Sequence, residues 1–263
     1  MVGYLNLFRV IHLAITFILL FAAFNTLGGL TQSICSDLKL PENFGLIMQA
    51  TIYLSLSIFN FFTGGIISKF GTKRVMPVCS LFYLIWIGAL ALPAYCSLNP
   101  HNSNLDNNIC KTQLFSEIVL IVMSIIVGCA AGPMWVSQAA YIEECSIDVK
   151  TETYQGIFYG IFMSQSLIGN LSSYLIFRFN HGKNFSDFTY IISCTCVALL
   201  GVISYFLLTQ PRNQTGEIVV KIQKSVPFCQ VVCNKIRALL VTIKELKMIL
   251  LLPSLIYSAV RII

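Results

Sequence analysis

Three residues near the middle of the chain could bind a ligand inside an otherwise apolar stretch. Trp135, Gln138 and Tyr141 recur at every third position, so on a helix they share one face and form a stripe of aromatic rings and one amide. Uncharged polar groups this deep in an apolar stretch should face protein or water rather than lipid. Pro133 would kink or locally open the same helix. A broken helix beside a polar stripe fits a substrate or ion pathway, although prolines also occur in inert spans.

The sequence gives little support for catalysis, for cofactor or metal binding, or for transport coupled to a charged residue. It shows no nucleophile–base pair, no phosphate-binding glycine-rich loop and no cluster of His or carboxylate ligands, so we expect no enzyme activity, no cofactor and no metal site. Charges inside a bundle would mark a proton-coupled or cation-coupled carrier. His12 and Glu117 lie near the ends of their apolar stretches, where snorkelling explains them. Arg261 is the exception, because it lies well inside the last apolar run.

The elements that carry these residues are predicted to be membrane-spanning helices. Hydrophobic residues make up 56% of the chain and charged residues 11%, with a mean hydropathy of +0.78, against roughly 25% charged residues in soluble domains. A helix needs roughly 20 apolar residues to cross a bilayer, and a backbone surrounded by lipid must satisfy its own hydrogen bonds. Six stretches qualify: Ile11–Leu30, Phe44–Ile67, Val75–Ser97, Leu114–Ile142, Tyr154–Phe177 and Phe188–Thr209.

A seventh apolar run begins at Met248 and is cut off at Ile263. The fold class predicted is therefore an all-α membrane protein, with a six-helix transmembrane bundle plus the truncated start of a seventh span. Residues 1–209 would form the bundle, 210–247 a cytoplasmic loop and 248–263 the seventh segment. In the loop, apolar residues spaced by three and four alternate with Lys235, Arg237 and other cations, which predicts an amphipathic basic helix on the anionic inner leaflet. Cys229 and Cys233 there could be palmitoylated or packed on that surface.

Lysine and arginine residues set the predicted orientation. With a cytoplasmic N-terminus, the inner segments hold twelve of these cations and the outer loops four, namely Lys39, Lys111, Arg178 and Lys183. This distribution obeys the positive-inside rule. The net charge of +6 is then a consequence of topology, so the lipid bilayer is the expected partner and nucleic acid is not.

The predicted outer loops carry two candidate covalent features, and one inner turn is acidic. Cys96 and Cys110 flank the same Asn-rich loop, so a disulfide could form in an oxidising lumen. Asn184 begins an acceptor triplet for glycosylation. The turn from Glu143 to Glu152 is expected to be solvated at the inner face.

The connection between the second and third stretches has the most specific local pattern. Gly64 allows a close helix approach, Gly71 permits a turn with positive φ, and Lys73 and Arg74 follow at the inner face. This pattern resembles the loop signature of the major facilitator superfamily, in which a glycine, an acidic residue and a basic pair join spans two and three. The acidic position is Ser68 here, so the charge relay of that signature is not expected.

The fourth and fifth stretches resemble the Unc-93-like family of ion-channel regulators and trafficking proteins. About fifty positions carry the resemblance, with weaker support from Asn25-Thr26-Leu27. The matching residues are Gly128, Gly132, Trp135, Gln138, Tyr141, Gly156, Phe158, Phe162, Gln165, Ser166, Gly169 and Asn170.

The two resemblances, together with residue spacing, suggest roles for these side chains. In facilitator-type halves the first and fourth spans line the central cavity, which makes Asn25 and Gln138 candidate cavity residues. The pairs Gly128 with Gly132 and Gly156 with Gly160 put small residues four apart, which permits close packing within the bundle or against a partner. Gln165 and Asn170 could join helices by hydrogen bonds or line the cavity.

Two functions remain at this stage. The Unc-93-like resemblance, the few intramembrane charges and the glycine faces favour a regulator or trafficking partner of ion channels or membrane receptors, acting through intramembrane helix contacts. The alternative is a secondary transporter that moves a small solute or ion by alternating access. A full facilitator architecture would need a missing C-terminal half or a second copy.

Overall fold

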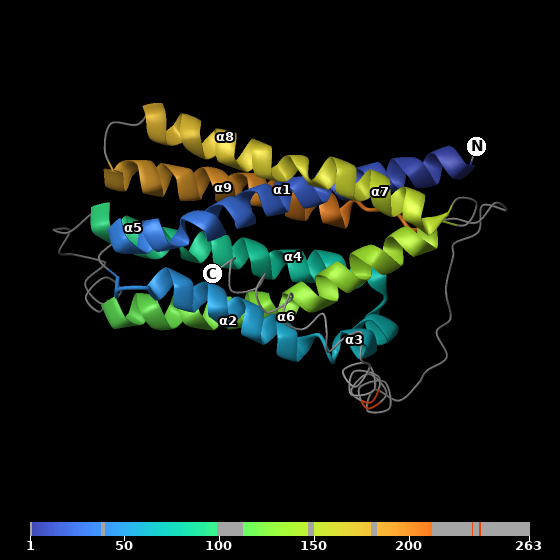
Figure 1. Cartoon of the computed structure of the whole chain (residues 1–263), viewed down its shortest axis with the longest axis horizontal. Helices are drawn as coiled ribbons and strands as arrows, with labels where there is room; N and C mark the ends of the chain where they lie inside the picture. The colour runs from blue at the N-terminus through green and yellow to red at the C-terminus, as the bar shows by residue number, and fades with distance from the viewer. Residues whose placement is uncertain are drawn as a thin grey trace, which may run out of the picture.

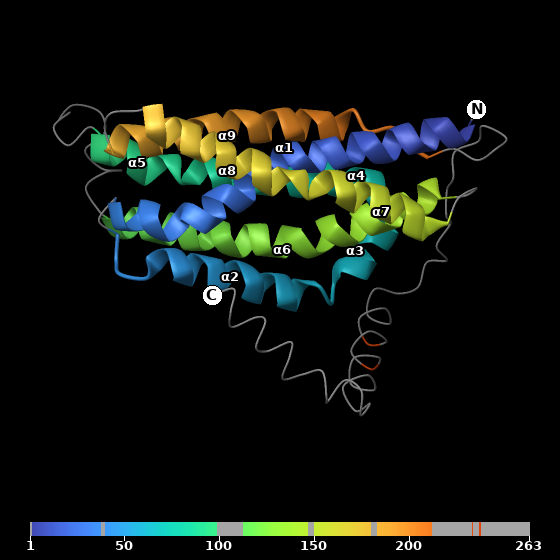
Figure 2. The same cartoon turned by 45° about the horizontal axis from the view of Figure 1, so that its top comes forward.

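The described part of the protein is built from helices alone. The computed structural model describes residues 2–37, 40–98, 113–146, 150–179 and 183–211, together with Cys233 and Arg237. The helices run side by side along the long axis of the molecule (Figures 1 and 2). Their bounds are α1 Val2–Asp37, α2 Phe44–Phe59, α3 Thr63–Phe70, α4 Thr72–Ala89, α5 Ala91–Leu98, α6 Gln113–Cys145, α7 Thr151–Phe162, α8 Ser164–Phe179 and α9 Lys183–Phe206.

Several of these helices are long and apolar enough to cross a membrane. Among the described residues, four regions pass this test by themselves: Tyr4–Ser36, Thr72–Tyr95, Leu114–Cys145 and Asp187–Phe206. The pair α2 and α3 passes as a fifth if its two helices, which are bent by 67°, count as one broken span. The prediction of an all-helical protein with apolar spans is confirmed. The seventh apolar run and most of the predicted basic loop lie outside the described residues.

Three predicted stretches are interrupted helices rather than single ones. The second divides into α2 and α3 at Asn60–Phe62, where Phe61 N–H bonds Ile58 O and Phe62 N–H bonds Phe59 O, the tighter pattern of a 3₁₀ turn. The third divides into α4 and α5 at Leu90, and the fifth into α7 and α8 at Met163. Met163 N–H still bonds Tyr159 O at 2.9 Å, so the helical hydrogen-bond pattern carries on into the break.

The packing has an internal symmetry. α6 packs against α2 and α4, whereas α1 packs against α7, α8 and α9. The helices form two sets in chain order, first α1, α2–α3 and α4–α5, then α6, α7–α8 and α9. When each member of one set is exchanged for the corresponding member of the other, the contacts of α6 with α2 and α4 become the contacts of α1 with α7, α8 and α9. α4 and α9, which are equivalent in this exchange, also pack against each other. Such an arrangement is typical of membrane bundles built from two structural repeats.

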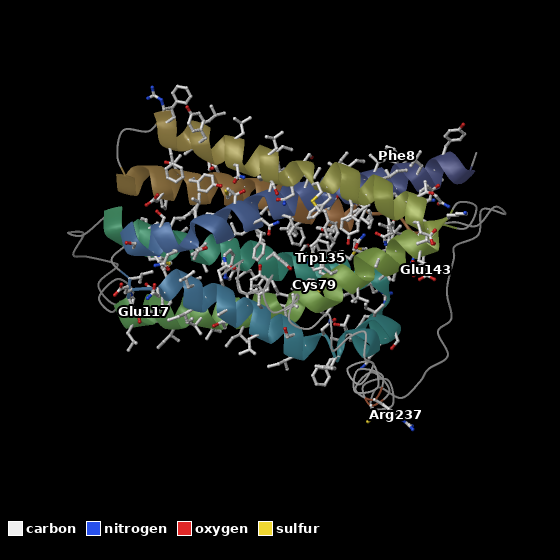
Figure 3. The ribbon with its side chains drawn as sticks, in the orientation of Figure 1. Phe8, Cys79, Glu117, Trp135, Glu143 and Arg237 are labelled. Carbon is white, nitrogen blue, oxygen red and sulfur yellow. The ribbon has the colours of Figure 1, made fainter. Side chains whose placement is uncertain are left out.

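Aromatic side chains fill the centre of the bundle. The Phe17 ring lies 5.4 Å from Trp135, 5.2 Å from Phe158 and 5.7 Å from Tyr205, measured between centroids. Figure 3 shows Trp135 and Cys79 in the interior, between the helices. Trp86 is fully buried, and its Nε1–H donates to Ser124 Oγ at 3.1 Å, which ties α4 to α6. The aromatic cluster therefore draws on α1, α6, α7 and α9.

Glycine allows the closest helix contacts. A Cβ on Gly132 would lie 3.0 Å from Thr63 Oγ1, and one on Gly128 would overlap the carbonyl oxygen of Ile52. A Cβ on Gly169 of α8 would overlap the side chain of Thr26 on α1. α6 thus approaches α2 and α3, and α8 approaches α1, at distances that larger residues would not permit.

We expect Gly128→Leu to destabilise the bundle, because α2 backbone occupies the space that the new side chain needs. Overpacking of this kind costs about 1–3 kcal/mol. Unfolding in detergent can be followed by thiol labelling of the buried Cys79 and Cys194. Gly156→Leu is the matched control, since nothing lies within 4 Å of a Cβ at that position. Equal losses of stability in the two variants would contradict this account of the contact.

Candidate functional site

A polar network joins α1 to α9 near the N-terminal end of the bundle. Arg9 is 5% exposed; its Nε–H donates to Thr209 Oγ1 at 3.0 Å and its Nη1 donates to Asn6 Oδ1 at 2.6 Å. One turn further along α1, His12 Nε2 lies 3.0 Å from Ser204 Oγ. The hydroxyl of Ser204 is also 2.7 Å from Thr16 Oγ1. A buried guanidinium and a half-buried imidazole are thus hydrogen-bonded to hydroxyl groups and to one amide.

This network was missed from the sequence, where Arg9 counted only toward topology and His12 was expected to snorkel. His12 is half-buried and has a hydrogen-bonding partner on the neighbouring helix, which snorkelling alone did not predict. A signal was present: Asn6, Arg9, His12 and Thr16 are spaced by three, three and four, so they form one polar stripe on α1. The partners on α9 could not be identified without knowing which helix α1 faces.

The stripe on α6 extends from the aromatic centre to the same network. Trp135 is half-buried, with its ring centroid 5.1 Å from that of Phe21. Gln138 is 1% exposed and its Nε2 donates to Gln155 Oε1 at 3.3 Å. Tyr141 is fully buried and its hydroxyl donates to the Thr209 carbonyl at 2.6 Å. These side chains face protein, and their role in binding a ligand stays a prediction.

Pro133 lies inside α6, which continues as a helix on both sides of it. Near the two ends of α6 lie Glu117 and Glu143, at opposite ends of the bundle (Figure 3). α6 therefore runs the length of the molecule as one helix that contains Pro133, and the expected kink or local opening there stays a prediction.

Asn25 lies in a different place, in a groove of about 610 Å³ between α1 and α2. Its wall has three amide side chains, Asn25, Gln32 and Gln49. Gln49 Nε2 donates to Gly28 O at 2.9 Å, and Gln32 Oε1 accepts from Leu46 N–H at 3.3 Å. The Asn25 side chain is exposed and no hydrogen bond of it is seen among the described residues. The groove offers neutral donors and acceptors, without a carboxylate or cation in its lining.

The connection from α3 to α4 turns sharply at Gly71, whose φ of 78° is in the left-handed region that favours glycine. Ser68, at the acidic position of the facilitator signature, donates its hydroxyl to Gly65 O within α3. Contact with α6 is made instead by Thr72, whose Oγ1 donates to Glu144 Oε2 at 3.2 Å. Lys73 and Arg74 are exposed. Gly64 is half-buried in α3.

The two glycines of α7 are placed differently from those of α6. Gly156 and Gly160 are exposed, and nothing lies within 4 Å of a Cβ at either position. In α8, Asn170 is exposed, whereas Gln165 is 5% exposed and donates from Nε2 to the neighbouring Ser166 Oγ. Gln165 Oε1 is buried without a hydrogen-bond partner among the described atoms. Gly156 and Gly160 therefore form an open stripe on α7, which no described residue covers. The hydrogen bond of Gln165 stays within its own helix.

Three predicted covalent sites lie wholly or partly outside the described residues. Asn184 lies in the first turn of α9 and Cys96 in α5, but the side chains of both are outside the described residues. Cys110 lies outside them altogether, as do Cys229 and Arg261. The proposed glycosylation and disulfide stay predictions.

Comparison with known proteins gives a family match over nearly the whole chain. The model of the Major Facilitator Superfamily matches residues 13–261. The chain is 25% identical to UNC93-like protein MFSD11 of Xenopus tropicalis over 215 residues, which is 81% of this chain and 43% of that protein. It is 30% identical to Protein unc-93 homolog A of Bos taurus over 184 residues, covering 65% of this chain and 34% of the relative.

A further relative carries a functional name. The "Putative potassium channel regulatory protein unc-93" of Caenorhabditis elegans is 26% identical over 182 residues, covering 65% of this chain and 22% of its own length. The chain thus spans less than half the length of each of these relatives. No solved structure matches.

The hydroxyl of Ser204 should contribute measurably to stability, because it serves both His12 and Thr16. Ser204→Ala leaves the half-buried imidazole without this partner, at an expected cost of about 0.5–1.5 kcal/mol in the free energy of unfolding. The matched control is Ser193→Ala on the same helix, since Ser193 Oγ bonds only Thr189 O one turn away. Unfolding in mixed detergent and SDS micelles measures the difference, and equal effects would show that the network is not a stabilising contact.

Proposed function

Because this chain belongs to the major facilitator superfamily and, within it, to the Unc-93-like family, we propose that it regulates or escorts an ion channel or membrane receptor through helix contacts within the bilayer. The relative from Caenorhabditis elegans is named as a potassium channel regulator, so a potassium channel is the first partner to test. The activity of the whole protein is part of the proposal, since the chain spans only a part of its relatives' length.

The proposal takes α7 and α8 together as the fifth of six spans. This pair lies along the bundle in both views (Figures 1 and 2), and α1 packs on both of its helices. α7 has 12 residues and α8 has 16, and the pair is not among the apolar candidate spans. The N-terminus and the connection with Lys73 and Arg74 lie at the same end of the bundle (Figure 1), which supports a cytoplasmic N-terminus.

The proposal rests on the open stripe of Gly156 and Gly160 on α7 together with the exposed Asn170 on α8. Gly156 and Gly160 leave room for another helix to approach, and the exposed amide of Asn170 would be poorly solvated by lipid. Exposed positions of this kind are stabilised when a second protein surface covers them. A channel helix that packs on the two glycines could use the Asn170 amide as a hydrogen-bonding partner.

We expect the double variant Gly156→Leu, Gly160→Leu to reduce co-purification with a co-expressed potassium channel while the protein remains folded. Leucine side chains would hold a neighbouring helix away from the α7 backbone. Gly29→Leu is the matched control, because Gly29 is also exposed with nothing within 4 Å of its Cβ position but lies in the groove between α1 and α2. Unchanged recovery of the channel with the double variant would reject α7 as the recognition surface.

A transporter is the second candidate, favoured by the groove of about 610 Å³ between α1 and α2. Its amide side chains could replace part of the hydration shell of a potassium ion or a neutral polar solute. Reconstituted vesicles should then show potassium flux with the original protein and a loss of flux with Gly29→Leu, whereas the α7 double variant should retain it. No flux with full-length protein, together with channel binding that depends on Gly156 and Gly160, would favour the regulator.

A further inference from the structure

An apolar groove between α3, α4 and α6 has the shape and polarity of a lipid site. Its volume is about 580 Å³. The lining consists of apolar and sulfur-containing side chains, except at one end, where Arg74 borders it. Val78, Phe82 and Ile125 are among the lining residues that remain exposed, so the groove opens on the surface of the bundle. It is separate from the open stripe on α7 and from the groove that contains Asn25.

The length of the groove suits the part of an acyl chain next to the lipid headgroup. Along α4 the lining extends from Arg74 to Phe82, and along α6 from Ile125 to Pro133. Eight residues of helix correspond to about 12 Å in each case. The two walls are therefore equally long. Cys129 and Ala130 supply small side chains on the α6 wall, and Phe59 and Phe70 border the groove from the α2 and α3 region.

The charges at the mouth of this groove attract an anion. Lys73 and Arg74 occupy the first turn of α4, which contains no acidic residue, so the positive end of the helix dipole adds to their charge. Neither side chain has a hydrogen bond or ion pair among the described residues. Lys69 lies nearby, with its Nζ 5.4 Å from the centroid of the Phe70 ring. Arg74 thus borders the end of the apolar groove itself, Lys73 precedes it in the same helical turn and borders the neighbouring cavity, and Lys69 lies in the last turn of α3.

One acidic side chain approaches the same turn but does not line the groove. Glu144 accepts a hydrogen bond from Thr72 Oγ1 and borders a different cavity, of about 640 Å³, which also has Tyr205 and Pro211 in its wall. Arg74 borders both spaces. Its guanidinium can therefore reach an anion at the mouth of the groove, while the Glu144 carboxylate accepts a hydrogen bond from the side-chain hydroxyl of Thr72.

We propose that this groove binds an anionic phospholipid of the leaflet at the N-terminal end of the bundle. One acyl chain lies between α4 and α6, and the phosphate is bound by Arg74 with Lys73 and Lys69. Basic pockets between helices at a cytoplasmic surface recognise anionic headgroups in this way. The charge at the mouth gives the preference for an anionic lipid, and the apolar lining requires that the ligand carry an acyl chain rather than be a free phosphate.

Photocrosslinking tests the site in the full chain. The protein is reconstituted in phosphatidylcholine nanodiscs with a trace of phosphatidylglycerol or phosphatidylcholine that has a diazirine on its acyl chain. Adducts on α4 and α6 should be enriched for the phosphatidylglycerol probe, and Arg74→Gln should lower that enrichment about fivefold. Arg178→Gln is the matched control, because Arg178 is exposed at the C-terminal end of α8.

A second pair of variants tests the acyl-chain channel. Cys129→Phe should fill the groove and reduce adducts from both probes, whereas Cys196→Phe, at an exposed cysteine of α9, should not. Equal adduct yields for the two lipids on the original protein would overturn the proposal in favour of ordinary annular lipid. So would an equal effect of Arg74→Gln and Arg178→Gln, or replacement of lipid adducts by crosslinks to a second copy of the chain.

Discussion

Close contact between helix backbones at small residues is the constraint on which this bundle depends. Helices in a bilayer gain little from the hydrophobic effect when they associate, because lipid tails are as apolar as leucine, so close packing has to supply the attraction. Gly128 and Gly132 bring α6 onto α2 and α3, and Gly169 brings α8 onto α1. The symmetry of the packing makes these equivalent contacts of the two sets of helices. Larger residues there would separate α6 from α2 and α3, and α8 from α1, and would open the aromatic centre.

Hydrogen bonds between side chains then add further connections between the helices. Trp86 joins α4 to α6 through Ser124, and Tyr141 joins α6 to the segment after α9 through the Thr209 carbonyl. The same residue, Thr209, accepts a hydrogen bond from Arg9. An arginine near the end of a span costs less than one at the bilayer centre, and hydroxyl and amide partners reduce the cost further. The N-terminal end of the bundle is therefore polar inside as well as at its surface.

Much of the fold followed from the length of the apolar stretches, since their limits agree with those of the helices to within a few residues except for α1, which is longer at both ends. The breaks could not be predicted. Leu90 and Met163 are ordinary apolar residues, and the bend after Phe59 depends on how α3 packs against α6. Spacing placed Trp135, Gln138 and Tyr141 on one face but could not show that Asn25 lies elsewhere, in a groove with α2. Nor could it distinguish the packed Gly128 from the open Gly156, because both belong to the same sequence pattern.

The exposed surface is not uniform in its small and polar groups, and this difference bears on the two proposed functions. α4 and α9 expose large apolar side chains such as Val78, Phe82 and Leu200, which suit lipid. α7 and the groove of α1 and α2 also expose glycines and amides, beside apolar side chains such as Leu54 and Tyr159, and these small and polar groups suit protein or water. Since the relatives are more than twice as long as the matched region, further segments of such a protein could cover one of these polar surfaces. In a transporter, both the open stripe on α7 and the groove between α1 and α2 should face the second bundle around a pathway. In a regulator, one of these two surfaces should be free to bind a partner. Identifying what covers the stripe on α7 would therefore distinguish the two proposed functions.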